Sequence, residues 1–283
     1  MSNGPLENKI GTTQRGIGPS YAARAARSGI RLAEVFNREL FETKLRRLEA
    51  GYRKRFGDLF VYDIEEELAR FDEYRPKLAK YAVDAVSFIR SAQESNKNIV
   101  VEGANSTTGK GIETRHFCLS PFEQALMLDL SYGSYPFVTS SDTTLAGIIG
   151  GLALNPKNIT DVIGVVKAYL VVVKYSTSIN YYTALNLTKL DVLDDFDTIK
   201  IAIAYKVDGQ ELDSYPADLD TLEKAEVVYH EMPGWKTPTT NARTFYDLPK
   251  AARDYVEYIE NFVGVKIKWI GTGPDREAMI KRA

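Results

Sequence analysis

The stretch TALNLTKLD, residues Thr183 to Asp191, is the part of the sequence that decides the fold class. Its apolar run ALNL leads directly into the polar turn TKLD, which is typical of a buried strand that feeds a loop. The stretch VKIKWIGTG, residues Val265 to Gly273, has the same form and stops at glycines. Both predict strands whose following loops lie where α/β proteins bind their ligands.

Helical patterns alternate with such strands along the chain. Between Leu40 and Phe56, apolar residues recur at helical spacing, which predicts a surface helix. Further helices are expected with Ile64, Leu68 and Phe71 on one face, after Pro76 with Val83, Val86 and Ile89, and from Asp247 and Pro249 onward with Tyr255, Ile259 and Phe262 on the inner face. This alternation predicts one α/β domain, residues 1–283, with a largely parallel central sheet flanked by helices.

Three more stretches are expected to contribute strands. The apolar runs NIVVEGA and VIGVVKAYLVVVKY predict buried strands. The stretch IKIAIAYKVDGQELDSY alternates between apolar and polar residues and turns at Asp208-Gly209, a favoured two-residue hairpin signal.

Composition and charge narrow the class of partner. The chain has 283 residues, of which 44% are hydrophobic and 26% charged, as in an ordinary soluble globular protein. Its 36 Lys and Arg face 38 Asp and Glu, which leaves a net charge of −2 and no basic excess for nucleic acid. Neither nucleic acid nor an anionic membrane is an expected partner.

The single cysteine, the lack of an apolar signal region and the shortness of the apolar runs together predict a cytoplasmic protein. Cys118 is the single cysteine, so no internal disulfide forms, and the first residues contain no apolar signal region. The most apolar run is interrupted by Lys167 and Lys174 and is too short for a membrane helix of roughly 20 residues.

The stretch IVVEGANSTTGKGIETRHF, residues Ile99 to Phe117, resembles a phosphate-binding loop only superficially. A Walker A loop has four residues between its glycine and Gly-Lys-Ser/Thr. Here five residues separate Gly103 from Gly109, and Lys110 is followed by Gly111. The spacing of the glycines differs from the Walker A pattern, and the Ser or Thr after the lysine is missing. The sequence therefore does not predict a Walker A loop.

Two loops at strand ends carry chemistry suited to a guanine base. The carboxylate of Asp191 would accept the N1–H and N2–H of guanine, which adenine does not offer, and the stem of Lys189 would cover a base face. GTGPDR, residues Gly271 to Arg276, offers small residues and N–H groups beside a base. Taken alone, each is an ordinary turn in most proteins.

A third loop, GTTQRGIGPSYAARAARSGIR, runs from Gly11 to Arg31 and suits a phosphate group. Its glycines permit close approach of the backbone, and Arg24, Arg27 and Arg31 are able to pair with phosphate oxygens. The alternative interpretation is a helix start with a solvated basic face.

The motifs and their order resemble one family over nearly the whole chain. They are GTTQRGIGPSYAARAARSGIR, VEGAN, YPFVTSSDTT, GVVKAY, LNLTKLDVLD, MPGWKTPTTNAR and WIGTGPDREAMI. Together they closely resemble adenylosuccinate synthetase, with a fungal character in VVVKYSTSIN. The resemblance implies a cytosolic homodimer that joins IMP to L-aspartate with GTP and Mg²⁺, through 6-phosphoryl-IMP, in AMP synthesis.

The resemblance also implies roles for individual residues. Thr13, Asn105 and Thr139 match IMP contacts, and Arg27 matches the arginine that one subunit donates to the IMP of its partner. The guanine-binding element matches Lys189, Leu190 and Asp191, and the loop over the same base matches Gly271, Thr272 and Gly273. His230 lies outside these motifs, so a structural or exposed histidine is expected there.

The chain departs from the family where the chemistry takes place. The family's N-terminal glycine-rich loop, with its catalytic aspartate, its nearby catalytic histidine and its part in binding the GTP phosphates, has no counterpart here. No catalytic residue and no protein ligand for Mg²⁺ are therefore assigned. The segment that grips aspartate and IMP after GVVKAY is missing, and Ser106 to Gln124 is an insertion that contains Lys110 and His116. We expect that insertion to form an exposed loop in which neither residue is catalytic.

Three hypotheses follow from this pattern. The first is an adenylosuccinate synthetase homologue, a GTP-dependent carbon–nitrogen ligase by family, that is inactive as this chain because groups for positioning and charge stabilisation are lost. The alternative is a non-catalytic regulatory or dimerisation partner of a complete synthetase. A third interpretation is a gene-model artefact with no stable product.

Overall fold

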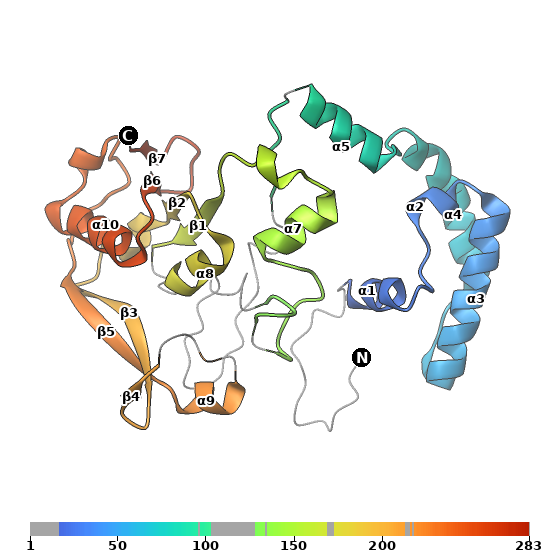
Figure 1. The fold of residues 1–283 in the computed structure, drawn as a ribbon, viewed down its shortest axis with the longest axis horizontal. Helices are drawn as coiled ribbons and strands as arrows, with labels where there is room; N and C mark the ends of the chain where they lie inside the picture. The colour runs from blue at the N-terminus through green and yellow to red at the C-terminus, as the bar shows by residue number, and fades with distance from the viewer. Residues whose placement is uncertain are drawn as a thin grey trace. The chain divides into compact units, whose positions relative to one another are not determined.

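The chain forms two compact units in the computed structural model, which describes residues 17–95, 97–102, 128–133, 135–168, 173–212, 216 and 218–282. The described residues of the helical unit fall within Thr12–Ile99, and those of the sheet unit fall within Val100–Ala283. Figure 1 shows the helices of the first unit in blue to green and the strands of the second in yellow to red. A single functional domain over residues 1–283 stays a prediction.

The helical unit consists of helices, and capping side chains set the starts of its longer ones, α3, α4 and α5. Its elements are α1 (Gly18–Ala25), α2 (Leu32–Val35), α3 (Arg38–Phe56), η1 (Gly57–Leu59), α4 (Ile64–Ala79) and α5 (Ala85–Glu94). Asn37 accepts the N–H of Leu40 at 3.1 Å and begins α3. Asp63 accepts the N–H groups of Glu65 and Glu66 and begins α4. Each cap satisfies N–H groups that lack a partner inside the helix.

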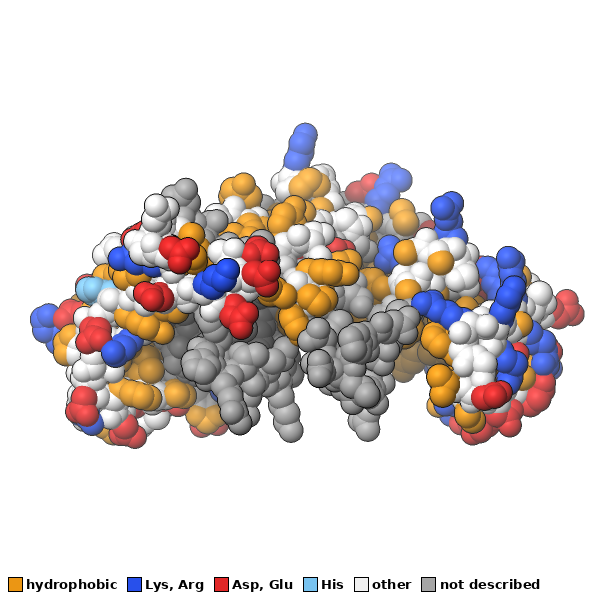
Figure 2. Space-filling view, turned by 90° about the horizontal axis from the view of Figure 1, so that it is seen from below, with side chains coloured by type: hydrophobic (Ala, Val, Ile, Leu, Met, Phe, Trp, Pro, Cys, Tyr) orange, Lys and Arg blue, Asp and Glu red, His pale blue; other side chains and the backbone are white. Residues whose placement is uncertain are grey.

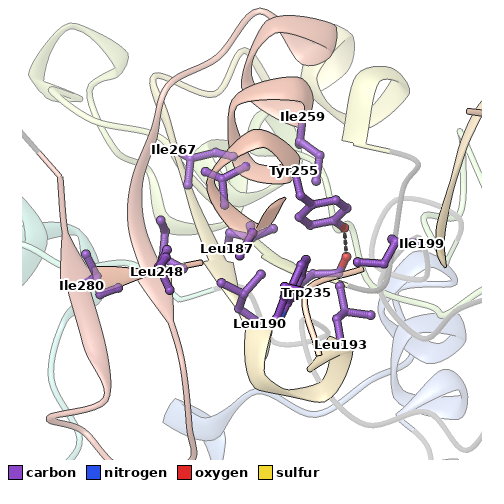
Figure 3. Packing of buried hydrophobic residues seen from close by; sticks show 14 of the residues in the cluster. Leu187, Leu190, Leu193, Ile199, Trp235, Leu248, Tyr255, Ile259, Ile267 and Ile280 are labelled. Carbon is purple, nitrogen blue, oxygen red and sulfur yellow. Dashed lines mark hydrogen bonds between the residues drawn. The ribbon is translucent and has the colours of Figure 1, made fainter. Parts of the chain in front are cut away.

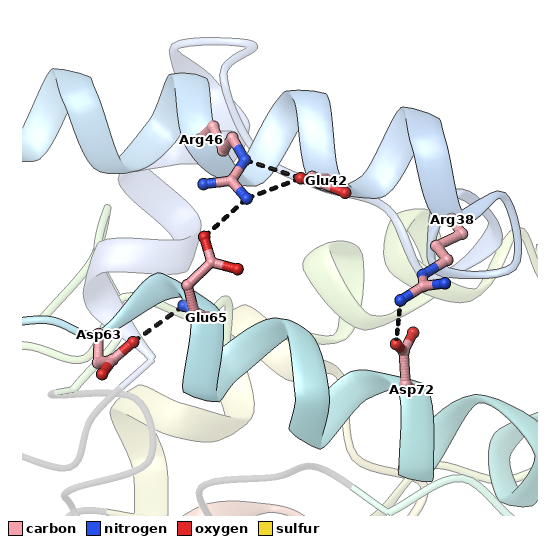
Figure 4. Close-up of polar contacts among 6 residues, drawn as sticks. All are labelled: Arg38, Glu42, Arg46, Asp63, Glu65 and Asp72. Atoms are coloured by element: carbon pink, nitrogen blue, oxygen red, sulfur yellow. Dashed lines mark hydrogen bonds and ion pairs between the residues drawn. The ribbon is translucent and has the colours of Figure 1, made fainter.

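A small core and surface ion pairs hold α3 against α4. Phe41 packs on Phe71 with ring centroids 4.7 Å apart. Outside this core, Arg46 bridges Glu42 and Glu65 from one helix to the next (Figure 4). Lys, Arg, Asp and Glu side chains crowd over this unit at the right of Figure 2. The predicted helix from Leu40 to Phe56 is confirmed.

The sequence predicts a helix that starts after Pro76. In the structure, Pro76 lies inside α4 instead. A proline removes one helical hydrogen bond, and here only Lys77, Leu78 and Ala79 follow it in the helix. The loss is therefore confined to the last turn. The next helix, α5, begins after the cap Asp84, so Val83 lies outside it.

The sheet unit contains a mixed, largely parallel sheet, which confirms the predicted α/β class. Its elements are α7 (Leu145–Leu152), η2 (Pro156–Asn158), β1 (Ile163–Lys167), α8 (Val173–Asn180), β2 (Ala184–Thr188), η3 (Leu190–Leu193), β3 (Thr198–Val207), β4 (Gln210–Glu211), α9 (Leu219–Lys224), β5 (Glu226–Pro233), η4 (Phe245–Asp247), α10 (Lys250–Val263), β6 (Ile267–Gly271) and β7 (Met279–Lys281). The strand order is β1-β2-β6-β7, with only β7 antiparallel to its neighbour.

A second, antiparallel sheet has the order β4-β3-β5. Its hairpin turns at Asp208 and Gly209, with φ of 52° and 79°. Two successive residues with positive φ match the twist of the flanking strands, and the predicted hairpin is confirmed.

Helix α10 covers one face of the four-stranded sheet and forms the main core with it (Figure 3). Tyr255 and Ile259, predicted for its inner face, are fully buried, whereas Phe262 is half-buried. The hydroxyl of Tyr255 donates to the carbonyl of Ala168 just after β1, and burial raises the pKa of this tyrosine. A buried phenol needs such a partner.

Two strand predictions fail in whole or in part. Asn98 to Glu102 is not a strand, and Val100 is 93% exposed; an apolar run forms a strand only where a neighbour pairs with it. The run VIGVVKAYLVVVKY is a strand only to Lys167, and from Val173 it belongs to helix α8. That helix packs on α10, where the ammonium of Lys174 lies 5.2 Å from the ring centre of Phe262. Among the described residues, no helix is long and apolar enough to cross a bilayer.

Candidate active site

The two loops predicted to hold a base lie side by side at the carboxyl edge of the sheet. Strands β2 and β6 are parallel neighbours, so the loops that follow them emerge at the same edge. A Cβ built on Gly271 would lie 3.3 Å from the Cα of Thr188, which is tighter than most such contacts. Glycine at this position lets the two backbones approach. The structure thus brings Lys189 to Asp191 next to Gly271 to Gly273.

Lys189 turns the chain from β2 into η3. Its backbone is left-handed, with φ 60° and ψ 40°, a conformation that costs energy for a residue other than glycine. Its side chain is exposed, so the aliphatic stem is available to a ligand. Such strain is often found at ligand sites.

Asp191 carries a buried carboxylate oxygen that has no partner. Its Oδ1 atom makes no hydrogen bond within the described structure. An unsatisfied buried acceptor is costly, particularly on a charged group, unless a ligand supplies the donor. Leu190, the residue before it, is fully buried in the main core. Its side chain therefore holds η3 in place, and a role for Leu190 in guanine binding stays a prediction.

Thr272 is also fully buried and is not available as a donor. Its N–H donates to the carbonyl of Ala278 at 2.9 Å, so it is not one of the N–H groups that the loop was expected to offer to a base. Gly273 instead opens onto a cavity of about 400 Å³. The lining residues are Thr240, Asn241, Arg243, Gly273, Pro274, Asp275, Glu277 and Ala278.

Sequence reasoning missed the group that holds one wall of this cavity. Asp194 accepts hydrogen bonds from Trp235 Nε1 at 2.7 Å, from the Thr239 N–H at 2.8 Å and from Thr239 Oγ1 at 2.9 Å. Arg243 donates from Nη1 to the carbonyl of Glu277 at 2.7 Å and so joins the two walls. The tryptophan and threonine belong to the family motif MPGWKTPTTNAR. Their partner, Asp194, lies about 40 residues earlier in the chain, so the motif alone does not reveal it.

Thr139 lies in a loop organised by Asp129, a second residue that the sequence did not indicate. Asp129 is 2% exposed and accepts the N–H groups of Ser131, Tyr132 and Thr143. Burial acts to raise the pKa of Asp129, but these N–H donors outweigh it and lower the pKa below its ordinary value. Thr139 donates its N–H to the carbonyl of Leu128 at 2.7 Å.

The other predicted IMP residues lie in the helical unit or outside the described residues. Arg27 belongs to the helical unit and is exposed just after α1, with φ 59°. Thr13, Asn105 and the insertion Ser106 to Gln124 lie outside the described residues. His230 stacks on Tyr258 with ring centroids 4.2 Å apart, in keeping with a structural role.

The described residues do not form a protein site for a metal ion. Nowhere in that part of the chain do three His, Cys, Asp or Glu side chains lie close enough to hold one.

Comparison with known proteins gives the family. A family model described as adenylosuccinate synthetase matches residues 2–173 and 170–280. The chain is 63% identical to the adenylosuccinate synthetase of Fusarium vanettenii, over 95% of this chain and 70% of the relative. It is 52% identical to that of Neurospora crassa, over 98% of this chain and 70% of the relative.

A solved structure agrees with these sequence matches. Fully ligated adenylosuccinate synthetase from Plasmodium falciparum superposes with a TM-score of 0.88 and 32% identity, over 98% of this chain and 72% of that one. The F. vanettenii alignment spans 309 positions but covers 95% of this chain, about 269 of its 283 residues; about 40 aligned positions, the difference, therefore face gaps here. From sequence motifs, fold and relatives alike, this chain belongs to the adenylosuccinate synthetase family of GTP-dependent ligases.

Proposed function

We propose that this chain binds guanine nucleotide at the carboxyl ends of β2 and β6. The observation that carries the proposal is the buried, unpartnered Oδ1 of Asp191. Guanine presents two adjacent donors, N1–H and N2–H, to a carboxylate, whereas adenine presents an acceptor at N1. Binding of guanine would satisfy the orphaned oxygen, and hydrogen bonds to a charged acceptor are about twice as strong as neutral ones.

The neighbouring residues have complementary roles in this proposal. The exposed stem of Lys189 covers one face of the base, and the Gly271 to Gly273 loop closes beside it. Leu190 contributes by packing in the core, and Thr272 by fixing the loop to Ala278. Magnesium would reach this site with the nucleotide phosphates, because Mg²⁺ is commonly bound through them.

IMP and L-aspartate are the expected co-substrates, in a cytoplasmic homodimer. Thr13, Asn105 and Thr139 are proposed IMP contacts of one subunit, and Arg27 is proposed to reach the IMP of the other. The proposal is supported by the family match and by the exposure of Arg27. An arginine pairs with phosphate through two parallel N–H bonds.

We infer that this chain alone does not turn IMP, aspartate and GTP into adenylosuccinate, GDP and phosphate. The inference is supported by the aligned positions, about 40 in all, that face gaps in this chain, and by the family match, which is in two pieces that meet at residues 170–173. In the family that the chain resembles, the segment after GVVKAY grips aspartate and IMP, and this chain lacks a matching segment. Purified chain with all substrates and Mg²⁺ should form no adenylosuccinate, and turnover at ordinary enzyme rates would contradict this.

The alternative is a regulatory partner that acts through Arg27. Mixed with a complete synthetase that lacks its own matching arginine, the chain should form mixed dimers and lower the Michaelis constant for IMP. The same mixture with Arg27→Leu is the control. Identical behaviour of the two mixtures, or no mixed dimer in sedimentation, would exclude this role.

Nucleotide titration tests the guanine site directly. By calorimetry the chain should bind GDP and not ADP, and Asp191→Asn should weaken GDP binding by about tenfold or more. The same substitution should favour xanthosine diphosphate, because an amide NH₂ donates to the C2 carbonyl of xanthine. Asp195→Asn, at an exposed neighbour, is the matched control. Equal affinity of all three proteins for GDP would refute the site.

A further inference from the structure

We propose that Asp194 is the positioning residue that aligns the guanine-binding carboxylate with the wall of the adjacent cavity. This inference rests on the proposed guanine site, and it assigns the nucleotide specificity of that site in part to a side chain that does not touch the base. Asp194 lies at the end of η3, and its own N–H donates to the carbonyl of Asp191 at 3.2 Å.

The side chain of Asp194 makes a connection that a neutral residue does not reproduce. Its Oδ1 accepts from Trp235 Nε1 and Thr239 Oγ1, and its Oδ2 accepts from the Thr239 N–H. Trp235 and Thr239 are 7% and 1% exposed, so water does not replace these bonds. An asparagine would point its NH₂ group at a donor in every orientation.

The segment that Asp194 holds leads directly into the cavity wall. Thr239 is followed by Thr240, Asn241 and Arg243, which line the cavity of about 400 Å³. Arg243 in turn donates to the Glu277 carbonyl on the opposite wall. One carboxylate therefore links η3, which carries Asp191, to both walls.

A backbone contact at the other end of the segment limits its freedom further. The N–H of Gly234 donates to the Asp197 carbonyl at 2.8 Å, and a Cβ at Gly234 would lie 1.8 Å from the Phe196 carbonyl oxygen. Only glycine fits this approach. The segment from Gly234 to Thr239 is thus fixed at its start to Phe196 and Asp197, where Lys236 also pairs with Asp197, and at its end to Asp194, which is the attachment nearer to the cavity.

The consequence is a loss of base discrimination when Asp194 changes. Without its acceptors, the segment moves relative to η3, and Asp191 no longer meets both guanine donors at once. The affinity for GDP should fall by about tenfold, as for loss of charged hydrogen bonds. Binding of inosine diphosphate, which lacks the 2-amino group, should fall less. A residue with a purely structural role would lower stability without changing this ratio.

The experiment compares Asp194→Asn with Asp195→Asn in the full chain, well below their melting temperatures. Calorimetry with GDP and with inosine diphosphate gives the ratio of affinities. We expect this ratio to fall toward one in Asp194→Asn and to stay unchanged in Asp195→Asn. Hydrogen exchange without nucleotide should quicken from Trp235 to Arg243 in Asp194→Asn alone.

Variants of the donors separate positioning from folding. Thr239→Ser keeps both donors and should retain the ratio, whereas Thr239→Val keeps only the N–H and should lower it. An unchanged ratio in Asp194→Asn, while Asp191→Asn lowers it, overturns this inference but leaves the guanine site intact. No GDP binding by the unsubstituted chain overturns both proposals.

Discussion

The sheet unit and the helical unit differ in where their polar groups are satisfied. In the sheet unit, Asp129 and Asp194 take backbone and side-chain donors in buried surroundings. In the helical unit, the ion pair of Arg38 and Asp72 joins side chains that are 70% and 36% exposed. Buried acceptors fix a geometry, whereas exposed pairs add little stability. The buried acceptor that organises the surroundings of the candidate nucleotide site, Asp194, therefore belongs to the sheet unit.

The largest effect should come from truncating the core of each unit. Ile270→Ala, at a residue with 0% exposure, should cost about 2–5 kcal/mol of unfolding free energy, because the surrounding core cannot fully collapse. Leu45→Ala in the smaller core should fall at the lower end of that range. Urea unfolding followed by circular dichroism measures both. If both substitutions shifted one common transition equally, the two units would not be separately stabilised.

Two glycine substitutions should have opposite signs in the two units. Gly234→Ala should destabilise by roughly 1–3 kcal/mol, since its methyl group would meet the Phe196 carbonyl. Gly51→Ala, inside α3 with open space around it, should stabilise by about 0.5–1 kcal/mol. Thermal melts compare them directly. If Gly234→Ala left the stability unchanged, the backbone around Phe196 would have to move to make room for the methyl group.

The acid sensitivity of the sheet unit should depend on Asp129. Its pKa is lowered on folding, so its contribution is present above the unfolded pKa and is lost as pH falls through the folded value, below about pH 4. Asp129→Asn should therefore cost on the order of 1–3 kcal/mol at neutral pH and flatten the acid dependence. Asp161→Asn, at an exposed carboxylate, is the control for denaturant titrations at several pH values. Parallel acid curves for both variants would disprove the assignment.

The smallest effect should come from the surface network of the helical unit. Glu65→Gln removes one ion pair of Arg46 and leaves Glu42 in place. The melting temperature should change little, and high salt should abolish the change, because exposed charges are screened. A large change in melting temperature that persists at high salt would mean that this network stabilises its unit as strongly as the buried acceptors stabilise the sheet unit.

The sequence predicted those elements whose pattern is local. The strands ending at Thr188 and Gly271, the turn at Asp208-Gly209 and the face of α10 follow from apolar periodicity and turn residues. The strand expected at Asn98 to Glu102 failed because pairing depends on a neighbour that the local sequence does not specify. Likewise, Asp191 was predicted from its place after a strand, but Asp194 was not, because its donors lie about 40 residues away.

By itself, the sequence determined the α/β class, the family and the two loops at the strand ends, because short-range patterns and motif order encode them. Only the tertiary structure decided that Leu190 and Thr272 are buried and that Asp191 keeps an unpartnered oxygen. It also decided that Asp194 ties η3 to the Trp235 and Thr239 segment. Burial and hydrogen-bond partnership depend on which distant segments meet, and that is settled by packing of the whole sheet unit.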